Sequence, residues 1–149
     1  MADRPSLVLR PAVKTDARLL YEWRNDPEAR KNSRQADFVS WESHEAWLAR
    51  ALSSPERIIR IVEEQGRPVG MVRADQCARG WELSWTVAPA VRGRGIGRRM
   101  MKQFVATLAK PLVAVIRTGN VPSIKIASAA GLLRVGTADQ PGFELWALD

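Results

Sequence analysis

Two kinds of hydrophobic periodicity run along this chain. Apolar residues occupy every second position in 81–87 (WELSWTV), which predicts a half-buried strand. They recur at helical spacing in 40–52, where Ser40 is the expected N-cap, and again from about 95 to 109. The run 112–117 (LVAVIR) is almost wholly apolar, which is typical of a strand covered on both faces.

The same rules, with helix caps and Gly or Pro breaks, predict the other elements. Strands are expected over 7–13, 57–63, 68–74, 132–136 and 143–148, and helices over 15–25 and 120–131, with a break at 25–30. The order is β-α-α-β-β-β-α-β-α-β-β. It predicts a mixed α/β (α+β) fold with one central, mostly antiparallel sheet flanked by helices. At 149 residues, we expect a single domain over 1–149.

Charge is distributed unevenly in this picture. The net charge is +7, yet residues 83–138 contain no Asp or Glu and carry nine Arg and Lys residues. The rest of the chain is therefore slightly acidic. A field of one sign raises the local concentration of an anionic ligand, although an arginine-rich composition would also produce a basic surface.

Other features of the composition restrict the setting. Cys77 is the sole cysteine, so an internal disulfide is excluded and a reducing compartment is favoured. No signal-peptide pattern opens the chain, and no apolar run approaches the roughly 18 residues of a membrane span. We expect a cytoplasmic protein that does not contact a membrane.

The segment 91–100 (VRGRGIGRRM) is the strongest candidate for a ligand site. It places glycines between a strand and a helix, where backbone N–H groups and the helix dipole favour a phosphate. A P-loop is excluded because Arg98 and Arg99 follow Gly97 where Lys and Ser or Thr are required. A dinucleotide fingerprint is excluded because no acidic residue follows until Asp139.

The pattern Arg92-x-x-Gly95-x-Gly97 resembles the coenzyme A loop of the GNAT superfamily of acyl-CoA N-acyltransferases. The segment 120–132 (NVPSIKIASAAGL) is similar to the next helix of that family, with Asn120 and Gly131 at matching positions. The expected order of elements agrees over nearly the whole chain. The resemblance implies transfer of an acetyl group from acetyl-CoA directly to a primary amine, without a metal.

The resemblance also implies which residues bind the cosubstrate. Backbone amides of the loop would hold the pyrophosphate, the preceding strand would pair with the pantetheine arm, and Asn120 and Ser123 would line the arm from the other side. The loop positions are Arg92, Gly93, Arg94, Gly95, Ile96, Gly97 and Arg98, and the strand positions are Trp85, Thr86 and Val87. The amide of Val87 is the expected oxyanion donor to the thioester carbonyl.

Proton transfer is where this chain departs from the family. Glu82, near the start of the pantetheine strand, is the candidate general base for the amine; the other interpretation is a solvated strand residue paired with an arginine. The family's general acid is a Tyr seven residues after the Asn, which here is Ala127. Ser128, Tyr21, Cys77 and His44 are the remaining side-chain candidates.

Residues 15–52 are expected to select the acceptor. They are similar to GNAT enzymes that acetylate nucleotide-linked amino sugars, and also to relatives that acetylate ribosomal-protein N-termini. Trp23, Arg24, Asn25 and His44 are candidate acceptor ligands, although the tryptophan also fits helix packing and Asn25 a helix stop. A small-molecule amine is favoured as the acceptor, and the basic field would suit an acceptor that also carries a negative charge. The protein is expected to be a monomer or homodimer.

A protein of another class remains as the second hypothesis. The nine positive charges of 83–138 would also suit a non-catalytic RNA- or ribosome-binding module. Against that interpretation, the basic stretch lacks the interleaved exposed aromatic residues of a single-strand binder. We do not expect nucleic acid to be the partner.

Overall fold

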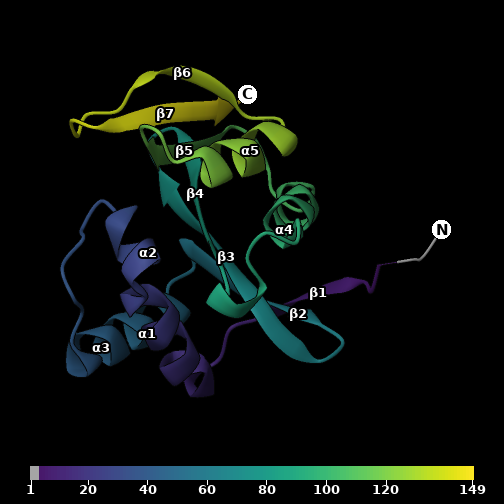
Figure 1. The fold of residues 1–149 in the computed structure, drawn as a ribbon. Helices are drawn as coiled ribbons and strands as arrows, with labels where there is room; N and C mark the ends of the chain where they lie inside the picture. The colour runs from purple at the N-terminus through teal and green to yellow at the C-terminus, as the bar shows by residue number, and fades with distance from the viewer. Residues whose placement is uncertain (1–3) are drawn as a thin grey trace.

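The computed structural model describes residues 4–149, and its elements follow the predicted order (Figure 1). The strands are β1 (Leu7–Pro11), β2 (Arg57–Glu64), β3 (Arg67–Cys77), β4 (Gly80–Val87), β5 (Leu112–Arg117), β6 (Leu133–Thr137) and β7 (Phe143–Leu148). The helices are α1 (Ala17–Asn25), α2 (Pro27–Lys31), α3 (Trp41–Leu52), α4 (Ile96–Val105) and α5 (Val121–Ala129), with 3-10 turns η1 (Lys14–Asp16) and η2 (Pro89–Val91).

The strands form one seven-stranded sheet in the order β1-β2-β3-β4-β5-β7-β6. Its pairs are antiparallel, apart from the parallel pair of β4 and β5 at the centre. The parallel pairing follows from the connection between the two strands. The chain leaves the end of β4, runs back across one face of the sheet as α4, and enters β5 in the same direction as β4. The predicted mixed fold with a mostly antiparallel sheet is confirmed.

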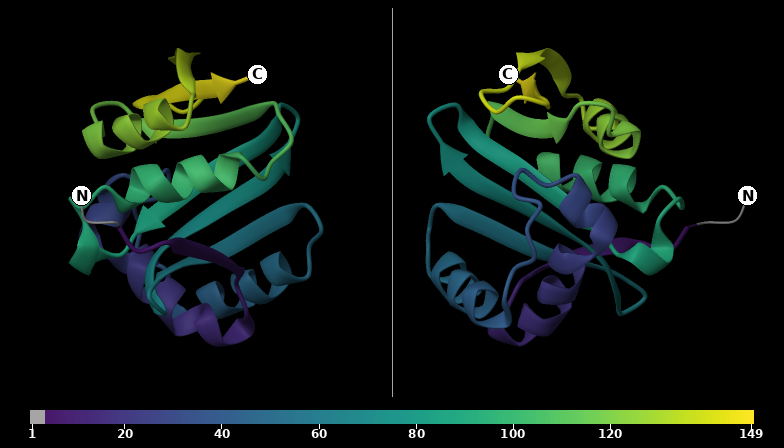
Figure 2. Two further views of the ribbon diagram at one scale, coloured as in Figure 1. Left: turned by 90° about the vertical axis from the view of Figure 1, so that its right-hand side faces the viewer. Right: turned by 60° about the vertical axis from the view of Figure 1, so that its left-hand side comes forward.

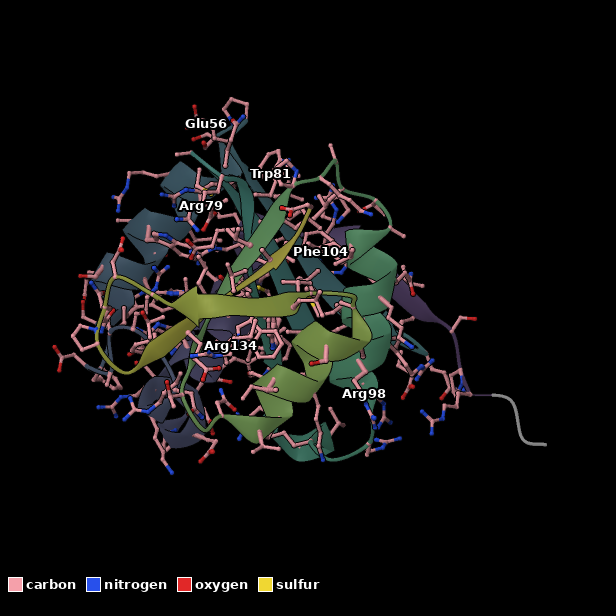
Figure 3. All side chains as sticks on the ribbon, turned by 90° about the horizontal axis from the view of Figure 1, so that it is seen from above. Glu56, Arg79, Trp81, Arg98, Phe104 and Arg134 are labelled. Atoms are coloured by element: carbon pink, nitrogen blue, oxygen red, sulfur yellow. The ribbon has the colours of Figure 1, made fainter. Side chains whose placement is uncertain are left out.

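Helices cover the two faces of the sheet (Figures 1 and 2). On one face, α1 and α3 bury Leu20, Trp23 and Leu48 against Ile59 and Ile61 of β2. On the other face, α4 and α5 pack over β3, β4 and β5 around a larger core; its fully buried members include Met100, Met101 and Phe104 of α4. Figure 3 shows Phe104 beneath α4 and Arg98 near the beginning of that helix. The sheet therefore separates an α1–α3 side from an α4–α5 side.

The structure fixes three element boundaries more closely than the sequence. The first strand, expected over 7–13 with an interruption or end at Pro11, does end at Pro11, since the carboxylate of Asp16 accepts a hydrogen bond from the Val13 amide at 2.8 Å and turns the chain. The helix predicted to reach residue 109 ends at Val105, where the Thr107 amide bonds to the Phe104 carbonyl at 2.9 Å. Pro111 disfavours helix at Lys110 just beyond. Finally, the break expected at 25–30 contains the short helix α2.

Candidate active site

The central strands separate after a short contact. The parallel pairing of β4 with β5 covers only Trp81–Leu83 against Leu112–Ala114. Within residues 4–149, the second half of β4 has a strand partner on its β3 edge alone, where Thr86 lies opposite Met71 and Ser84 opposite Arg73. A wedge-shaped gap therefore opens in the middle of the sheet.

Backbone groups of alternate β4 residues face this gap. The amide of Trp81 donates to the Pro111 carbonyl on the β5 side at 3.2 Å, whereas that of Ala88 donates to Val69 of the β3 segment at 2.9 Å. Because successive N–H groups of a strand point to opposite edges, those of Trp85 and Val87 point as Trp81 does, into the gap. They are the donors that an extended amide-containing arm would meet.

The glycine loop closes the wide end of the gap and starts α4. Gly93 and Gly95 have φ of 80° and 77°, a left-handed conformation that favours glycine, and Gly95 is the N-cap of α4. No side chain among residues 4–149 caps this helix. Its first N–H groups therefore remain available to an anion such as a phosphate.

Gly97 has a packing role that the motif did not suggest. It is buried, and a Cβ atom there would lie 2.4 Å from Cδ1 of Ile126 and 3.2 Å from Cγ2 of Val87. The absence of a side chain lets α4 approach both α5 and β4. This glycine therefore sets the distance between the loop and the two elements beside it.

The arginines of the loop point in different directions. Arg92 forms an ion pair with Asp26, the N-cap residue of α2, at 2.7 Å, and Arg94 and Arg99 lie 3.8 and 3.3 Å from Glu64 of β2. Burial would raise the pKa of Asp26, but hydrogen bonds from Arg92 and the Ala29 amide outweigh it and lower that pKa. Arg98 instead lines the cleft, and so do Arg92, Gly93, Gly95, Ile96 and Gly97. Arg94 does not line it.

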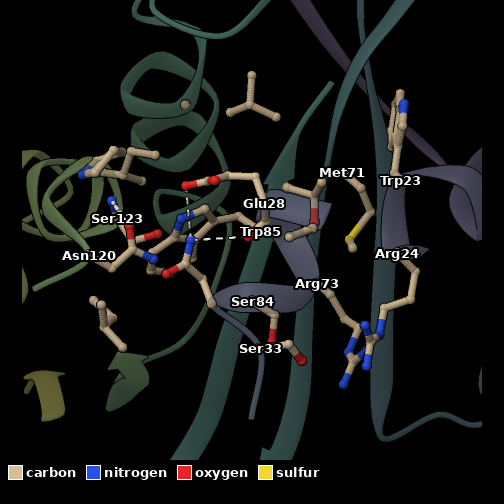
Figure 4. Close-up of a pocket in the computed structure, with 18 of the residues that line it drawn as sticks. Trp23, Arg24, Glu28, Ser33, Met71, Arg73, Ser84, Trp85, Asn120 and Ser123 are labelled. Carbon is tan, nitrogen blue, oxygen red and sulfur yellow. Dashed lines mark hydrogen bonds between the residues drawn. The ribbon is translucent and has the colours of Figure 1, made fainter. Parts of the chain in front are cut away.

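The opposite wall of the gap comes from the start of α5. Asn120 is the N-cap of α5 and accepts a hydrogen bond from the Ser123 amide at 3.4 Å, and both residues line the cleft. Figure 4 shows these two side chains on the same side of the cleft as Trp85. The cap interaction and a ligand-facing position therefore coincide at Asn120.

One cleft of about 1550 Å³ joins the glycine loop to the α1–α3 side of the sheet. That volume is large enough for a nucleotide-sized cosubstrate together with a second small molecule. Trp23, Arg24 and His44, which are candidate acceptor ligands from the sequence, line the end of the cleft beside α1 and α3. Asn25 does not line it: its side chain donates to the Val39 carbonyl and accepts from the Val39 amide at 2.9 and 2.8 Å, and so holds the loop between α2 and α3.

At the end of the cleft beside α1 and α3, burial lowers the pKa of two side chains, His44 and Arg24. Burial lowers the pKa of His44, outweighing a hydrogen bond to the backbone of Ala17, so this imidazole is neutral at pH 7. Burial, together with the charges of Arg30 and Arg73, also lowers the pKa of Arg24. Figure 4 shows the guanidinium groups of Arg24 and Arg73 beside one another.

Glu82 lies in the cleft but is paired. Its Oε2 forms an ion pair with the Arg34 guanidinium, which comes from the loop between α2 and α3. The carboxylate is about four-fifths buried, whereas the Arg34 side chain is 48% exposed. The position therefore combines both interpretations from the sequence, a carboxylate in the cleft and an ion pair with an arginine.

The candidate proton donors are scattered. Ala127 is 1% exposed and packs in the core, Ser128 is exposed, and Cys77 is exposed at the end of β3. Tyr21 packs against Phe38 and Trp41 outside the cleft. Of the four side chains considered, only His44 lines the cleft.

Comparison with known proteins identifies the class to which this fold and cleft belong. A family model described as an acetyltransferase (GNAT) domain matches residues 6–133. The chain belongs to the GNAT acetyltransferase family. It is therefore an acyl-CoA-dependent acetyltransferase that uses acetyl-CoA. No curated protein sequence matches it significantly.

Solved structures share the fold along nearly the whole chain. A domain from Methanocaldococcus jannaschii is 23% identical with a TM-score of 0.85, covering 97% of this chain and 98% of that one. Aminoglycoside acetyltransferase AAC(6')-Ib in complex with coenzyme A is 18% identical, with a TM-score of 0.80 and coverage of 95% and 93%. Spermidine N-acetyltransferase from Vibrio cholerae, in complex with coenzyme A and spermine, is 15% identical, with a TM-score of 0.80 and coverage of 95% and 92%.

Several cleft residues were not among the sequence candidates. Arg34, Arg73, Glu28 and Gln140 line the cleft, as do Arg117 and Lys125. Arg73 had a usable signal, because a charged residue in the otherwise apolar run 68–74 requires a polar environment on one face. Arg34 and Gln140 lie in loops, where no periodicity indicates direction.

Among residues 4–149, no helix is long and apolar enough to span a membrane, and no group of three potential ligands could hold a metal ion.

Proposed function

We propose that this acetyltransferase acts on the amine of a small polar molecule, with an amino sugar or nucleotide-linked amino sugar favoured over a protein N-terminus. The observation that carries the proposal is a contact across the cleft. The Gln140 side chain, between β6 and β7, donates to the Arg34 carbonyl at 3.1 Å, and the Arg34 guanidinium pairs with Glu82. While it is closed, this bridge narrows the cleft between the α2–α3 loop and β4, which favours a small acceptor over an extended peptide.

The cosubstrate would occupy the gap and the loop. In this proposal the amides of Trp85 and Val87 bind the pantetheine arm, with Thr86 between them, and the amides of Gly93 to Arg98 at the start of α4 bind the pyrophosphate. Asn120 and Ser123 line the opposite wall, and Arg98 faces the same space. Val87, the last β4 residue, offers its N–H where charge develops on the acyl oxygen.

Glu82 is the proposed acceptor of the amine proton, through bridging water, because it lies five residues before Val87 on β4, about 17 Å at the usual rise of a strand. It lies on the face of β4 shared with Ser84 and Thr86, toward the α1–α3 side, while the side chains of Leu83 and Trp85 pack on the α4–α5 side. The Arg34 guanidinium must leave Oε2, or the second oxygen must serve, before the carboxylate accepts a proton. Binding of an acceptor between the α2–α3 loop and β4 would provide that displacement.

The acceptor class is tested by acetyl-CoA consumption across a panel of amines. The panel contains amino sugars, nucleotide-linked amino sugars, spermidine and peptides with free N-termini. We expect turnover of small amines and at least tenfold lower kcat/KM for peptides. A preference for peptides would contradict the proposal and favour the protein N-terminal alternative.

The Val87 role is tested by a pair of variants. Val87→Pro removes the N–H that faces the gap, while the β3 ladder uses the amides of the neighbouring residues; Val87→Ala retains the N–H. We expect kcat to fall by about a hundredfold or more in Val87→Pro relative to Val87→Ala. Equal kcat in the two folded variants would remove the amide from the mechanism.

A further inference from the structure

The end of the cleft beside α1 and α3 contains a partly buried cation, Arg24, without a counter-ion among residues 4–149. Arg24 donates from Nη2 to the Gln35 carbonyl at 2.7 Å, whereas its Nη1 is buried and has no hydrogen-bond partner among residues 4–149. No carboxylate in that part of the chain forms a salt bridge with it. Buried charged donors without partners are rare and costly, so this one indicates a missing ligand group.

Other groups around Arg24 strengthen the positive character. Arg73 of β3 lies beside it, and although Asp75 takes the Nε and Nη2 donors of Arg73 at 2.8 and 2.7 Å, Nη1 of Arg73 remains. Arg30 adds a further positive charge nearby. The Nε2 atom of the neutral His44 is also buried without a partner. The carboxylate of Glu82, farther along the sheet, is already paired with Arg34.

We propose that Arg24 and Arg73 form a subsite for an oxyanion, a phosphate or carboxylate carried by the acceptor, with His44 as a neutral hydrogen-bonding neighbour. This inference rests on the proposed function and specifies its acceptor. A guanidinium pair binds planar or tetrahedral oxyanions through charge-assisted hydrogen bonds. The same charges repel polycations, so spermine, which one named structural neighbour binds, and the aminoglycosides in the name of the other are poor acceptors here.

The sheet register also limits the shape of the acceptor. Arg73 lies opposite Ser84, and Val87 is three residues farther along β4, about 10 Å at the usual rise of a strand. The amine must reach the Val87 end while the oxyanion reaches Arg73. An α-amino acid places both groups on one carbon and is too short. A phosphorylated amino sugar or an ω-amino acid spans the distance.

Matched amines test this subsite. Glucosamine is compared with its phosphate ester, and ε-aminocaproamide with ε-aminocaproate; glycine and spermidine complete the set. We expect kcat/KM at least tenfold higher for an anionic member than for its neutral partner, and the preferred pair identifies phosphate or carboxylate. Equal values within both pairs, or preference for spermidine, would overturn the subsite while leaving the acetyltransferase function intact.

Variants assign the effect to the two arginines. Arg24→Gln and Arg73→Gln should each abolish the preference in kcat/KM for the anionic amine of a pair. Arg73→Lys, which keeps the positive charge, should retain part of that preference. Asn25→Ser is the matched control, because Asn25 also holds the α2–α3 loop, through the Val39 carbonyl at 2.9 Å, but carries no charge and does not line the cleft. A loss of preference as large in Asn25→Ser would mean that the loop, not the subsite, is responsible.

A binding measurement separates this inference from the proposed function. The protein saturated with coenzyme A is titrated with inorganic phosphate, and the thermal midpoint is followed. We expect stabilisation in the wild type and in Asn25→Ser, but none in Arg24→Gln. No stabilisation in the wild type would contradict the oxyanion subsite. If phosphate stabilises as expected but no amine is acetylated, the proposed function fails and the subsite stands.

Discussion

At the residue scale, the cleft contains two carboxylates in different situations. Glu82 is mostly buried and paired with Arg34, whereas Glu28 of α2 is exposed and bonded at 3.5 Å to the Asn32 side chain. A general base must lie within reach of the amine and keep a carboxylate free of competing donors in the complex. Only Glu82 also lies on β4, next to the strand segment that faces the gap.

Replacing each carboxylate by its amide distinguishes them. Glu82→Gln should lower kcat by about a hundredfold or more and change the pH dependence of kcat, because a proton acceptor is lost. Glu28→Gln, with the same change on another wall of the cleft, should keep kcat within a few-fold. The measurement is the pH–rate profile with saturating amine; an unchanged profile in Glu82→Gln would exclude it as the base.

A second residue-scale prediction concerns Gly97. Gly97→Ala places a Cβ 2.4 Å from Ile126, so we expect about 2 kcal/mol lower stability toward urea unfolding and a raised KM for acetyl-CoA. Gly136→Ala is the matched control, because that position has no positive φ and no heavy atom within 4 Å of the added Cβ. Equal stability of the two variants would show that α4 can shift without cost.

These residues also mark the limits of reading the sequence. The motif indicated the glycine loop and its helix, because backbone chemistry repeats with fixed spacing. It did not reveal that Gly97 touches Ile126, since that contact requires α5 to be packed in place. At Asn25 the helix stop is confirmed, since α1 ends there, but its side-chain partner, Val39, was not predicted because it lies 14 residues away in a loop without periodicity. Contacts between side chains far apart in the sequence cannot be predicted from a local pattern of residues.

At the element scale, the ion pair between Arg92 and Asp26 connects the glycine loop to α2. The loop is expected to hold the cosubstrate, and α2 leads into the loop that carries Arg34. Asp26 has two roles, because the same Oδ2 caps α2 by accepting from the Ala29 amide at 3.1 Å. The two roles can be separated by substitution.

Asp26→Ser retains a capping oxygen but loses the ion pair, whereas Asp26→Ala loses both. We expect Asp26→Ala to be about 1 kcal/mol less stable than Asp26→Ser. Both should raise the KM for acetyl-CoA if the ion pair positions the loop. Thermal unfolding and steady-state kinetics measure the two effects; an unchanged KM in both variants would limit Asp26 to helix capping.

At the scale of the whole molecule, the uneven charge has a functional reading. The acid-free segment 83–138 contains the loop, α4 and the start of α5, which together surround the proposed coenzyme A site. Acids from other segments pair with three of its arginines: Glu64 with Arg94 and Arg99, and Asp26 with Arg92. Arg98, Arg117 and Lys125 line the cleft and remain as its attractive charges.

Added salt should therefore weaken cosubstrate binding. We expect the KM for acetyl-CoA to rise several-fold as ionic strength increases from about 0.05 to 0.5 M. At the higher ionic strength, the Debye length becomes shorter than the separations over which these cationic side chains attract the phosphates of the cosubstrate. Acetyl-dephospho-coenzyme A, which lacks one phosphate, should show a smaller rise. If KM rose equally with ionic strength for the two cosubstrates, the ribose phosphate would not interact with this positive field.

The separation of β4 from β5 has a last consequence, for the exchange of backbone hydrogens with solvent. Without cosubstrate, the amides of Trp85 and Val87 should exchange rapidly, whereas those of Ser84 and Thr86, the residues directly before them, are held by β3 and should exchange slowly. Saturating coenzyme A should slow the first pair and leave the second nearly unchanged. Site-resolved NMR would then record an every-second-residue footprint, in which the bound molecule acts as a temporary strand that completes the sheet.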